Sequence, residues 1–310
     1  MLAKAEAADK ADVPDGMCIP DELARREERL KKLAEARAKI EARAKERSEQ
    51  EKTEYEAKLA ARKAKEKATG KKPGGRPPEP PAERPSPTDQ INLTDEGSRI
   101  MPVTGGGFEQ SYNAQAVVTE GSMLVVAGDV VQAANDKQQL QPMLAKMAAL
   151  PEELGEPDVI LADNGYFSEA NVNACAAAGI APLIALGRDG HHPSLEERLA
   201  DAPAAPENPT PVKAMAHRLQ TAEGKTLYTK RKHTPEPVFG IIKSVLGFRQ
   251  FLLRGLDNVR GKWSLVTMAW NVKRMFALMA AGRAAARAPN LHPVLSAAAL
   301  LTVRQAARLG

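Results

Sequence analysis

Three carboxylates stand where chemistry could take place at the rim of a sheet. Asp163 directly follows the apolar run VILA at residues 159–162, and Asp95 ends the stretch QINLTD. Glu236 opens an apolar helical pattern and is followed by a proline, which helices tolerate in their first turn. In open α/β sheets, ligands bind beyond the carboxyl ends of the strands, because the loops there carry polar groups that a buried strand cannot hold. Each acid also has a structural explanation, since Asp caps turns and an acid suits the positive end of a helix dipole.

Basic residues surround Glu236. The run KRK at residues 230–232 precedes it, and Lys243 follows seven positions later. Seven residues of helix return to nearly the same face about 10 Å further along the axis, so Glu236 and Lys243 could both face one extended anion. A DNA backbone is such an anion. The alternative is a solvated basic face beside a buried apolar face at residues 239–242.

The elements that must position these groups form an α/β pattern between residues 90 and 280. Short apolar runs bounded by turn residues predict strands, and apolar residues at helical spacing predict helices between the later strands. Three strands, a helix, a strand, a helix and a strand make a mixed sheet flanked by helices. The predicted strands are residues 90–94, 112–119, 123–131, 158–162 and 181–185, and the predicted helices are residues 136–150 and 168–178.

The rest of this domain is less regular. Residues 186–233 are irregular and partly Pro-rich, which indicates an insertion carrying one short helix at 211–220. The amphipathic block at 235–279 predicts two helices packed on the sheet, in which Trp263, Trp270 and Phe276 have the spacing of a buried helix face. Residues 281–310 form an Ala- and Arg-rich tail without an assigned role.

The N-terminal part has a different composition. Residues 1–19 are predicted to be disordered, and residues 20–69 consist of strong helix formers with acid-to-base pairs four positions apart. A coiled-coil seam through Leu33 and Ile40 would next need an apolar residue where Arg47 stands. We therefore expect a long, charged, solvated single helix.

A linker is predicted at residues 70–89, because this stretch is rich in Pro and Gly and cannot continue a helix. Its GGRP resembles the core of an AT-hook, in which an Arg lies in the DNA minor groove. A plain spacer is the favoured alternative.

The charge balance and the cysteines limit the class of protein. The chain has 44 Lys and Arg against 39 Asp and Glu, a net charge of +5, and the basic excess lies in the N-terminal helical region. Cys18 and Cys175 have no CxxC spacing, so neither a disulfide framework nor a zinc site is indicated and a reducing cytosolic compartment is expected. Neither a signal peptide nor an apolar run of membrane-spanning length is present.

Several motifs occur together and in order: NLTDEGSRIM, SYNAQAVV, AANDKQQL, LADNGYFSEANV, RKHTPEPVFGIIKSVLGFRQFLLRGL and WSLVTMAWNVKRM. From about residue 92 to 279, the ordered set resembles the catalytic domain of bacterial insertion-sequence transposases, which carry a DDE triad on a ribonuclease H-like fold. The resemblance implies a ribonuclease H-like mixed sheet, preceded by the long helix and the linker. It also implies that the N-terminal DNA-binding region of similar proteins is missing.

The resemblance implies roles for three acids. The first Asp of the triad follows the first strand, which implies Asp95, with Asp129 as second choice. The second Asp lies in a DxGY motif, which implies Asp163, and the Glu is implied to be Glu236. Together they would hold two Mg²⁺ ions, or Mn²⁺ as a substitute, because paired divalent ions clamp the attacking and leaving oxygens of a phosphoryl transfer and prefer oxygen ligands.

Basic side chains are implied to bind DNA phosphates. The family signature Tyr-x2-Arg-x3-Glu-x6-Lys fixes Lys243 by its spacing. The Arg position holds Lys232, with Arg231 one residue early, and the Tyr position holds Thr229, with Tyr228 one residue early. Either the pattern slips by one residue or the phosphates are contacted differently. Arg231, Lys232 and Lys243 are the predicted DNA-binding residues.

The implied activity is DNA transposition, that is, metal-dependent strand cleavage and strand transfer at the ends of an insertion sequence. The implied partners are terminal inverted repeats, target DNA and a second copy in a homodimer. Two alternatives stay open: an inactive or truncated transposase remnant that only binds DNA, and a standalone metal-dependent nuclease. We expect a cytoplasmic, nucleoid-associated protein without membrane association.

Overall fold

The structure is a computed structural model that describes residues 19–70, 74, 77–102, 106–187, 204–287, 299–301 and 308–309. The predictions for residues 1–18, for Gly75 and Arg76 of GGRP, for part of the insertion and for most of the C-terminal tail lie outside these ranges. The chain divides into two units, Met1–Thr94 and Asp95–Gly310, which are described separately. A search of the described helices finds none that could cross a membrane.

The first unit is built on one long helix, α2 (Ile19–Thr69). Most of its side chains are exposed, and acid–base pairs one turn apart join Glu22 to Arg26, Glu28 to Lys32 and Glu54 to Lys58. This agrees with the solvated helix predicted from the composition. Exposed pairs of this kind contribute a few tenths of a kcal/mol each, about as much as helix propensity adds per residue.

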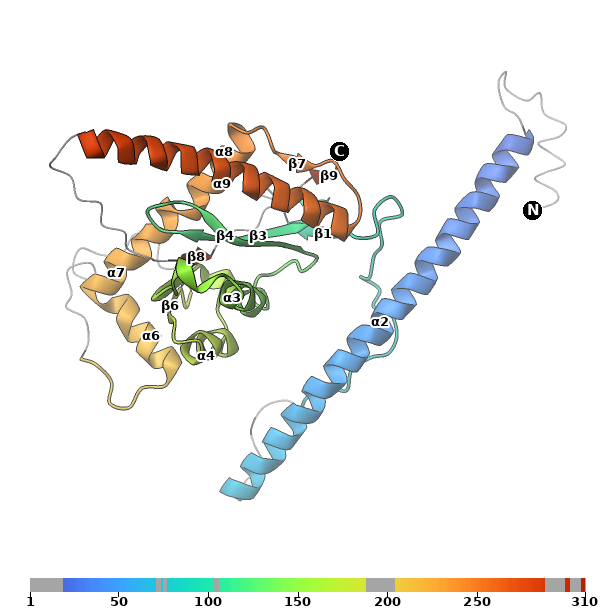
Figure 1. The fold of residues 1–310 in the computed structure, drawn as a ribbon. Coiled ribbons are helices and arrows are strands. Elements are labelled where there is room, and N and C mark those ends of the chain that lie inside the picture. The colour runs from blue at the N-terminus through green and yellow to red at the C-terminus, as the bar shows by residue number, and fades with distance from the viewer. Residues whose placement is uncertain are drawn as a thin grey trace. The chain divides into compact units, whose positions relative to one another are not determined.

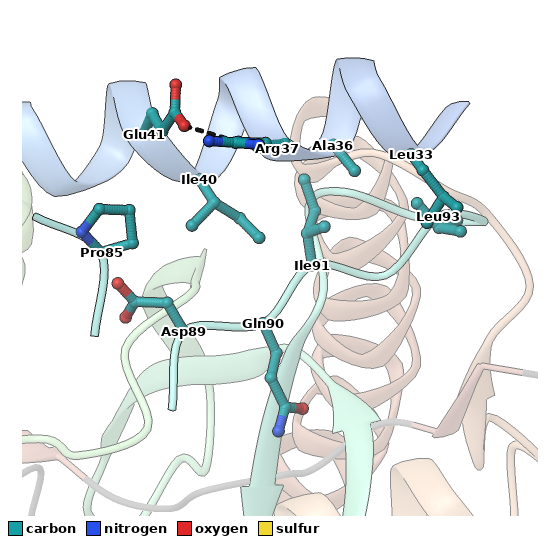
Figure 2. Close-up of a pocket in the computed structure, with 10 residues that line it drawn as sticks. All are labelled: Leu33, Ala36, Arg37, Ile40, Glu41, Pro85, Asp89, Gln90, Ile91 and Leu93. Carbon is teal, nitrogen blue, oxygen red and sulfur yellow. Dashed lines mark hydrogen bonds and ion pairs between the residues drawn. The ribbon is translucent and has the colours of Figure 1, made fainter. Parts of the chain in front are cut away.

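The described part of the predicted linker lies along α2. The guanidinium of Arg47 donates two hydrogen bonds of 2.8 Å to the carboxylate of Asp89, and Lys52 pairs with Glu83. Figure 2 shows the open groove between the helix and this segment, with Ile40 on one side and Ile91 on the other. The position that interrupts the heptad, Arg47, thus anchors the segment that covers this face of the helix.

The second unit is centred on a mixed five-stranded sheet with the strand order β4-β3-β8-β5-β6 (Figure 1). β3 is antiparallel to β4 and to β8, whereas β5 is parallel to β6 and to β8. Two small pairs lie outside this sheet, the hairpin β1–β2 and the parallel pair β7–β9. The strands are β1 (Arg99–Pro102), β2 (Phe108–Ser111), β3 (Asn113–Thr119), β4 (Val125–Val131), β5 (Val159–Ala162), β6 (Ala181–Ile184), β7 (Gln250–Phe251), β8 (Ala299–Leu301) and β9 (Arg308–Leu309).

Helices cover both faces of this sheet. Along β3, Val117 faces a core with α3, α4 and α6, while Ala116 and Val118 face a second core with α8 and α9. This alternation follows from the two-residue period of a strand. The helices are α3 (Leu140–Ala148), α4 (Glu169–Ala177), α6 (Pro211–Gln220), α7 (Ala222–Thr229), α8 (Pro235–Ser244) and α9 (Leu256–Arg287), with short 3₁₀ turns η1 (Glu152–Leu154), η2 (Asn164–Tyr166) and η3 (Lys230–His233).

The α/β prediction is confirmed in outline, with two corrections. The strand predicted at 90–94 is wrong, because these residues belong to the segment that lies on α2 and have no partner strand there. The short helix predicted at 211–220 is confirmed as α6, but it is not the single helix of the insertion, because α7 follows it directly. Thr221 ends α6, and its hydroxyl accepts a hydrogen bond from Gly224 N at 3.0 Å, so the same residue starts α7. The two helices predicted after residue 235 are α8 and α9.

Candidate functional site

Asp163 lies directly after β5 and begins η2. Its Oδ1 accepts a hydrogen bond from Gly165 N at 2.8 Å, and its side chain is half-buried. A Cβ atom on Gly165 would stand 2.9 Å from this Oδ1 and 3.3 Å from Oδ2 of Asp136. Because it has no side chain, Gly165 allows both carboxylates to approach the same turn. Both distances start from one point, so the Asp163 and Asp136 oxygens lie no further apart than the sum of these two distances.

Asp136 belongs to a buried polar network behind this turn. Its Oδ1 accepts hydrogen bonds from the side-chain amides of Asn113, at 2.7 Å, and Gln115, at 2.9 Å. The oxygen of the Gln115 side chain accepts from the hydroxyl of Tyr166, and the backbone carbonyl of Tyr166 accepts from Asn171 at 2.7 Å. All five residues are buried, which makes their mutual hydrogen bonds important, because a buried polar group without a partner costs about 1–3 kcal/mol. The motifs SYNAQ, ANDK and DNGY thus meet at one place.

Tyr228 and Arg231 connect the end of β5 to Glu236. The hydroxyl of Tyr228 donates to the carbonyl of Ala162, the residue before Asp163, at 3.2 Å. The guanidinium of Arg231 lies 5.6 Å from the centre of the Tyr228 ring, and one of its nitrogens is 3.8 Å from a Glu236 oxygen. Two of the predicted acids are therefore linked through two side chains.

The geometry bears on how the family signature is placed. Tyr228 and Arg231 make the contacts with the site, whereas the hydroxyl of Thr229 donates to carbonyls within its own helix and Lys232 is exposed. The additional residue between Arg231 and Glu236 is accommodated where η3 meets α8, at Thr234 with φ −115° and ψ −70°. These contacts favour the alternative in which the pattern slips by one residue at its Tyr and Arg positions over the alternative in which phosphates are contacted differently.

Two cationic side chains near Glu236, Lys243 and Arg231, are not fully paired with anions or hydrogen-bond acceptors. Burial lowers the pKa of the Lys243 ammonium, and no carboxylate pairs with it among the residues that the structure describes. Nε of Arg231 is buried without a hydrogen-bond partner in the same part of the chain. Gly240 lies between Glu236 and Lys243 on the same helix face, and a Cβ there would meet nothing within 4 Å. Packing therefore does not require a glycine at this position. Alanine would stabilise the helix interior by about 0.5–1 kcal/mol.

Comparison with protein families identifies this region. Residues 204–276 match a family model described as a transposase DDE domain. This segment of the chain is therefore similar to part of a transposase DDE domain. The matched segment contains Tyr228, Arg231, Glu236 and Lys243, while Asp163 precedes it. Comparison with curated proteins and with solved structures gives no match.

The DDE-domain relationship has consequences for the chemistry. It relates the chain to enzymes that transfer polynucleotide strands and to the nuclease chemistry of transposition, and it implies a DNA substrate. Transposase DDE domains generally use divalent metal ions. Within the described ranges, no three His, Cys, Asp or Glu side chains lie close enough together to hold a metal ion. The structure therefore does not gather Asp95, Asp163 and Glu236 into a metal site.

Asp95 accepts hydrogen bonds from several protein groups. It is only 3% exposed, and both of its oxygens accept from the hydroxyl of Tyr112, at 2.8 and 2.9 Å. Gly97 N and Gly255 N each add a hydrogen bond of 3.1 Å to Oδ1. These bonds tie the start of the second unit to the start of α9, and they account for a buried carboxylate in structural terms. The metal-binding role of Asp95 stays a prediction.

Asp129, the alternative first acid, also has structural partners. One of its oxygens lies 3.0 Å from Lys146 and the other 3.0 Å from Arg260. The carboxylate that the structure does place beside Asp163 is Asp136. The motif ANDK contains this residue, but its spacing from Asp163 in the sequence gives no sign that both lie near Gly165.

Proposed function

We propose that the chain acts on DNA as a transposase, cutting strands at the ends of an insertion sequence and joining them to target DNA. One observation carries the proposal: Tyr228 and Arg231 hold the strand end at Asp163 and the helix start at Glu236 in one place. A DNA-cleaving enzyme needs acids and phosphate-binding cations together. The match of residues 204–276 to a transposase DDE domain supports this choice of chemistry.

The cations are assigned to the DNA backbone. Lys243 is half-buried and has no anionic partner in the described part of the chain. The free-energy cost of burying its charge is therefore offset only when an anion binds. Arg231 offers a guanidinium beside Glu236, and a guanidinium binds phosphate through two parallel hydrogen bonds. Lys232 is exposed beside it. Gly240 leaves the face between Glu236 and Lys243 open to a phosphate backbone.

Asp163 and Glu236 are the proposed catalytic acids. Both carboxylates remain accessible: Asp163 is half-buried, and the Glu236 side chain is 51% exposed. They are donors of the kind that Mg²⁺ or Mn²⁺ prefers, although the described residues do not complete a set of three. Such ions, when bound, supply the positive charge that activates water and stabilises a developing phosphoryl charge. The protein's own part is to hold Asp163 through Gly165 N and to set Glu236 beside Arg231.

We further propose that the second unit has a ribonuclease H-like fold. An antiparallel pair, β3 and β4, lies on one side of the mixed sheet and a parallel pair, β5 and β6, on the other, with helices on both faces. Asp163 then lies at the carboxyl end of a strand, where α/β sheets bind ligands. This arrangement supports the proposal without needing a role for Asp95.

The test uses the full chain, labelled DNA carrying terminal inverted repeats, target DNA and Mg²⁺. We expect cleavage and joining by the wild type, and we expect Asp163→Asn to abolish cleavage while DNA binding is kept or improved. Glu169→Gln is the matched control, because Glu169 is an exposed acid in the first turn of the neighbouring helix. Equal cutting by the Asp163 variant would overturn the assignment.

A remnant that only binds DNA is the second candidate. The observation that favours it is the missing three-acid metal site within the described ranges. The same experiment separates the functions: binding alone supports the remnant, cleavage without joining supports a standalone nuclease, and cleavage with joining supports the transposase.

A further inference from the structure

Helix α9 packs on the sheet with one face only. Val259, Trp263 and Trp270 are buried in the core beneath it, and the indole N–H groups of the two tryptophans donate to the carbonyls of Gln115 and Met123. Arg274 lies on the same face and donates to the carbonyl of Ser122. This face of α9 therefore packs against the sheet of the second unit (Figure 1).

The opposite face of α9 carries a second apolar stripe. Its members lie about half a turn from the buried tryptophans, and each is between 48% and 68% exposed. The prediction that Phe276 belongs to the buried face with Trp263 and Trp270 is therefore wrong, since six positions after Trp270 is the other side of a helix. We define the α9 stripe as Leu265, Met268, Val272, Met275, Phe276 and Met279.

We infer that the α9 stripe is the surface through which two copies of this chain associate, with the two helices antiparallel across a two-fold axis at Val272. The spacing is the same in both directions from that residue. Leu265 and Met279 lie seven positions away on either side, and Met268 and Phe276 lie four positions away. An antiparallel pair places Leu265 opposite Met279, Met268 opposite Phe276 and Val272 opposite Val272, as a two-fold interface requires, while Met275 faces the small Ala269.

The charge pattern favours a second copy over DNA. Between Leu265 and Met279 the sequence contains only two charged residues, Lys273 and Arg274, and Arg274 is held against the sheet. The exposed Lys273 lies next to Val272, but the residue at the matching position of an antiparallel copy is the uncharged Asn271, so two like charges do not face each other across the axis. DNA binding needs a basic surface, which this face does not offer.

The exposed area is also sufficient. Half-exposed side chains of this size present on the order of 100 Å² each, so six from each copy would remove on the order of 1,200 Å² from water. That is the lower end of the range for stable protein–protein interfaces. The inference does not depend on the proposed catalysis, because the stripe contains none of the proposed catalytic or DNA-binding residues.

Sedimentation velocity of the full chain without DNA tests the oligomeric state. We expect a dimer for the wild type. Val272→Glu places two carboxylates against each other at the axis and is expected to weaken association by about tenfold or more. Ser264→Glu, on the same helix but outside the stripe, is the matched control. Circular dichroism confirms that both variants fold, which is expected because both sites are exposed.

A cysteine at the axis tests the geometry. In a Cys18→Ser background, Val272→Cys should form a disulfide between copies under mild oxidation, because residues at a two-fold axis bring their Cβ atoms to the roughly 4 Å that a disulfide needs. Ser264→Cys should not. A wild type that is monomeric at all concentrations would overturn the inference. So would a dimer that is indifferent to Val272→Glu and forms no cross-link with Val272→Cys.

Discussion

Replacing Gly165 by alanine tests the geometry around Asp163. The new Cβ would stand 2.9 Å from Oδ1 of Asp163, which is shorter than non-bonded atoms tolerate, and 3.3 Å from Oδ2 of Asp136. Asp136 is fixed by two amide donors, so the Asp163 carboxylate must move away and lose its 2.8 Å hydrogen bond from Gly165 N. A hydrogen bond to a charged group contributes about 1.5–3 kcal/mol, which lowers the melting temperature of a unit of this size by roughly 3–12 °C.

The control is Gly261→Ala, in the interior of α9, where a Cβ would meet nothing within 4 Å. Alanine there is expected to stabilise the helix by about 0.5–1 kcal/mol. Melting temperatures by circular dichroism should therefore move in opposite directions, and only the Gly165 variant should lose DNA cleavage while it still binds DNA. Equal stability of the two variants would refute the close approach of the two carboxylates.

Three further predictions concern single side chains. Burial and the hydrogen bond to the Asp95 carboxylate raise the pKa of Tyr112, so the native state binds more protons than the unfolded state above about pH 10 and stability falls as the pH rises. Urea unfolding should show a shallower alkaline loss for Tyr112→Phe than for wild type, and equal slopes would contradict the assignment. Lys243→Met should raise the melting temperature, because it removes a half-buried charge, yet weaken DNA binding in a fluorescence anisotropy assay; unchanged affinity would remove Lys243 from the phosphate site. Gly240→Leu should also stabilise α8 while it blocks the DNA backbone, and tighter binding by this variant would show that the gap has no such role.

The sequence predicts the strands and helices around the site well, because their signals are local. The apolar run before Asp163 forms β5, and Ser168 accepts a hydrogen bond from Asn171 N as the cap of α4. The strand predicted at 90–94 fails because a strand needs a partner, and that partner cannot be read from five residues. In the same way, no local pattern shows that residues 299–301 form a strand between β3 and β5.

The site is predicted less completely than the fold. The sequence predicts correctly that Asp163 follows a strand and that Glu236 opens a helix, and their catalytic role stays a prediction. The sequence does not show that Tyr228, rather than Thr229, makes the link between them. That choice depends on how η3 turns before α8, which is a matter of tertiary packing. Asp95 looks equivalent to Asp163 in the sequence, and only the structure shows the tyrosine hydroxyl and the two backbone amides that occupy it.

The buried network of Asn113, Gln115, Asp136, Tyr166 and Asn171 limits how this sequence can change. Each member depends on another for its hydrogen bonds, so a substitution at one position leaves a buried partner unsatisfied and destabilises the fold. Glu236 and Lys243 are different, since the fold would tolerate their loss or even gain from it. A related sequence that keeps the network but lacks these two residues would therefore fold in the same way without the DNA chemistry proposed for them.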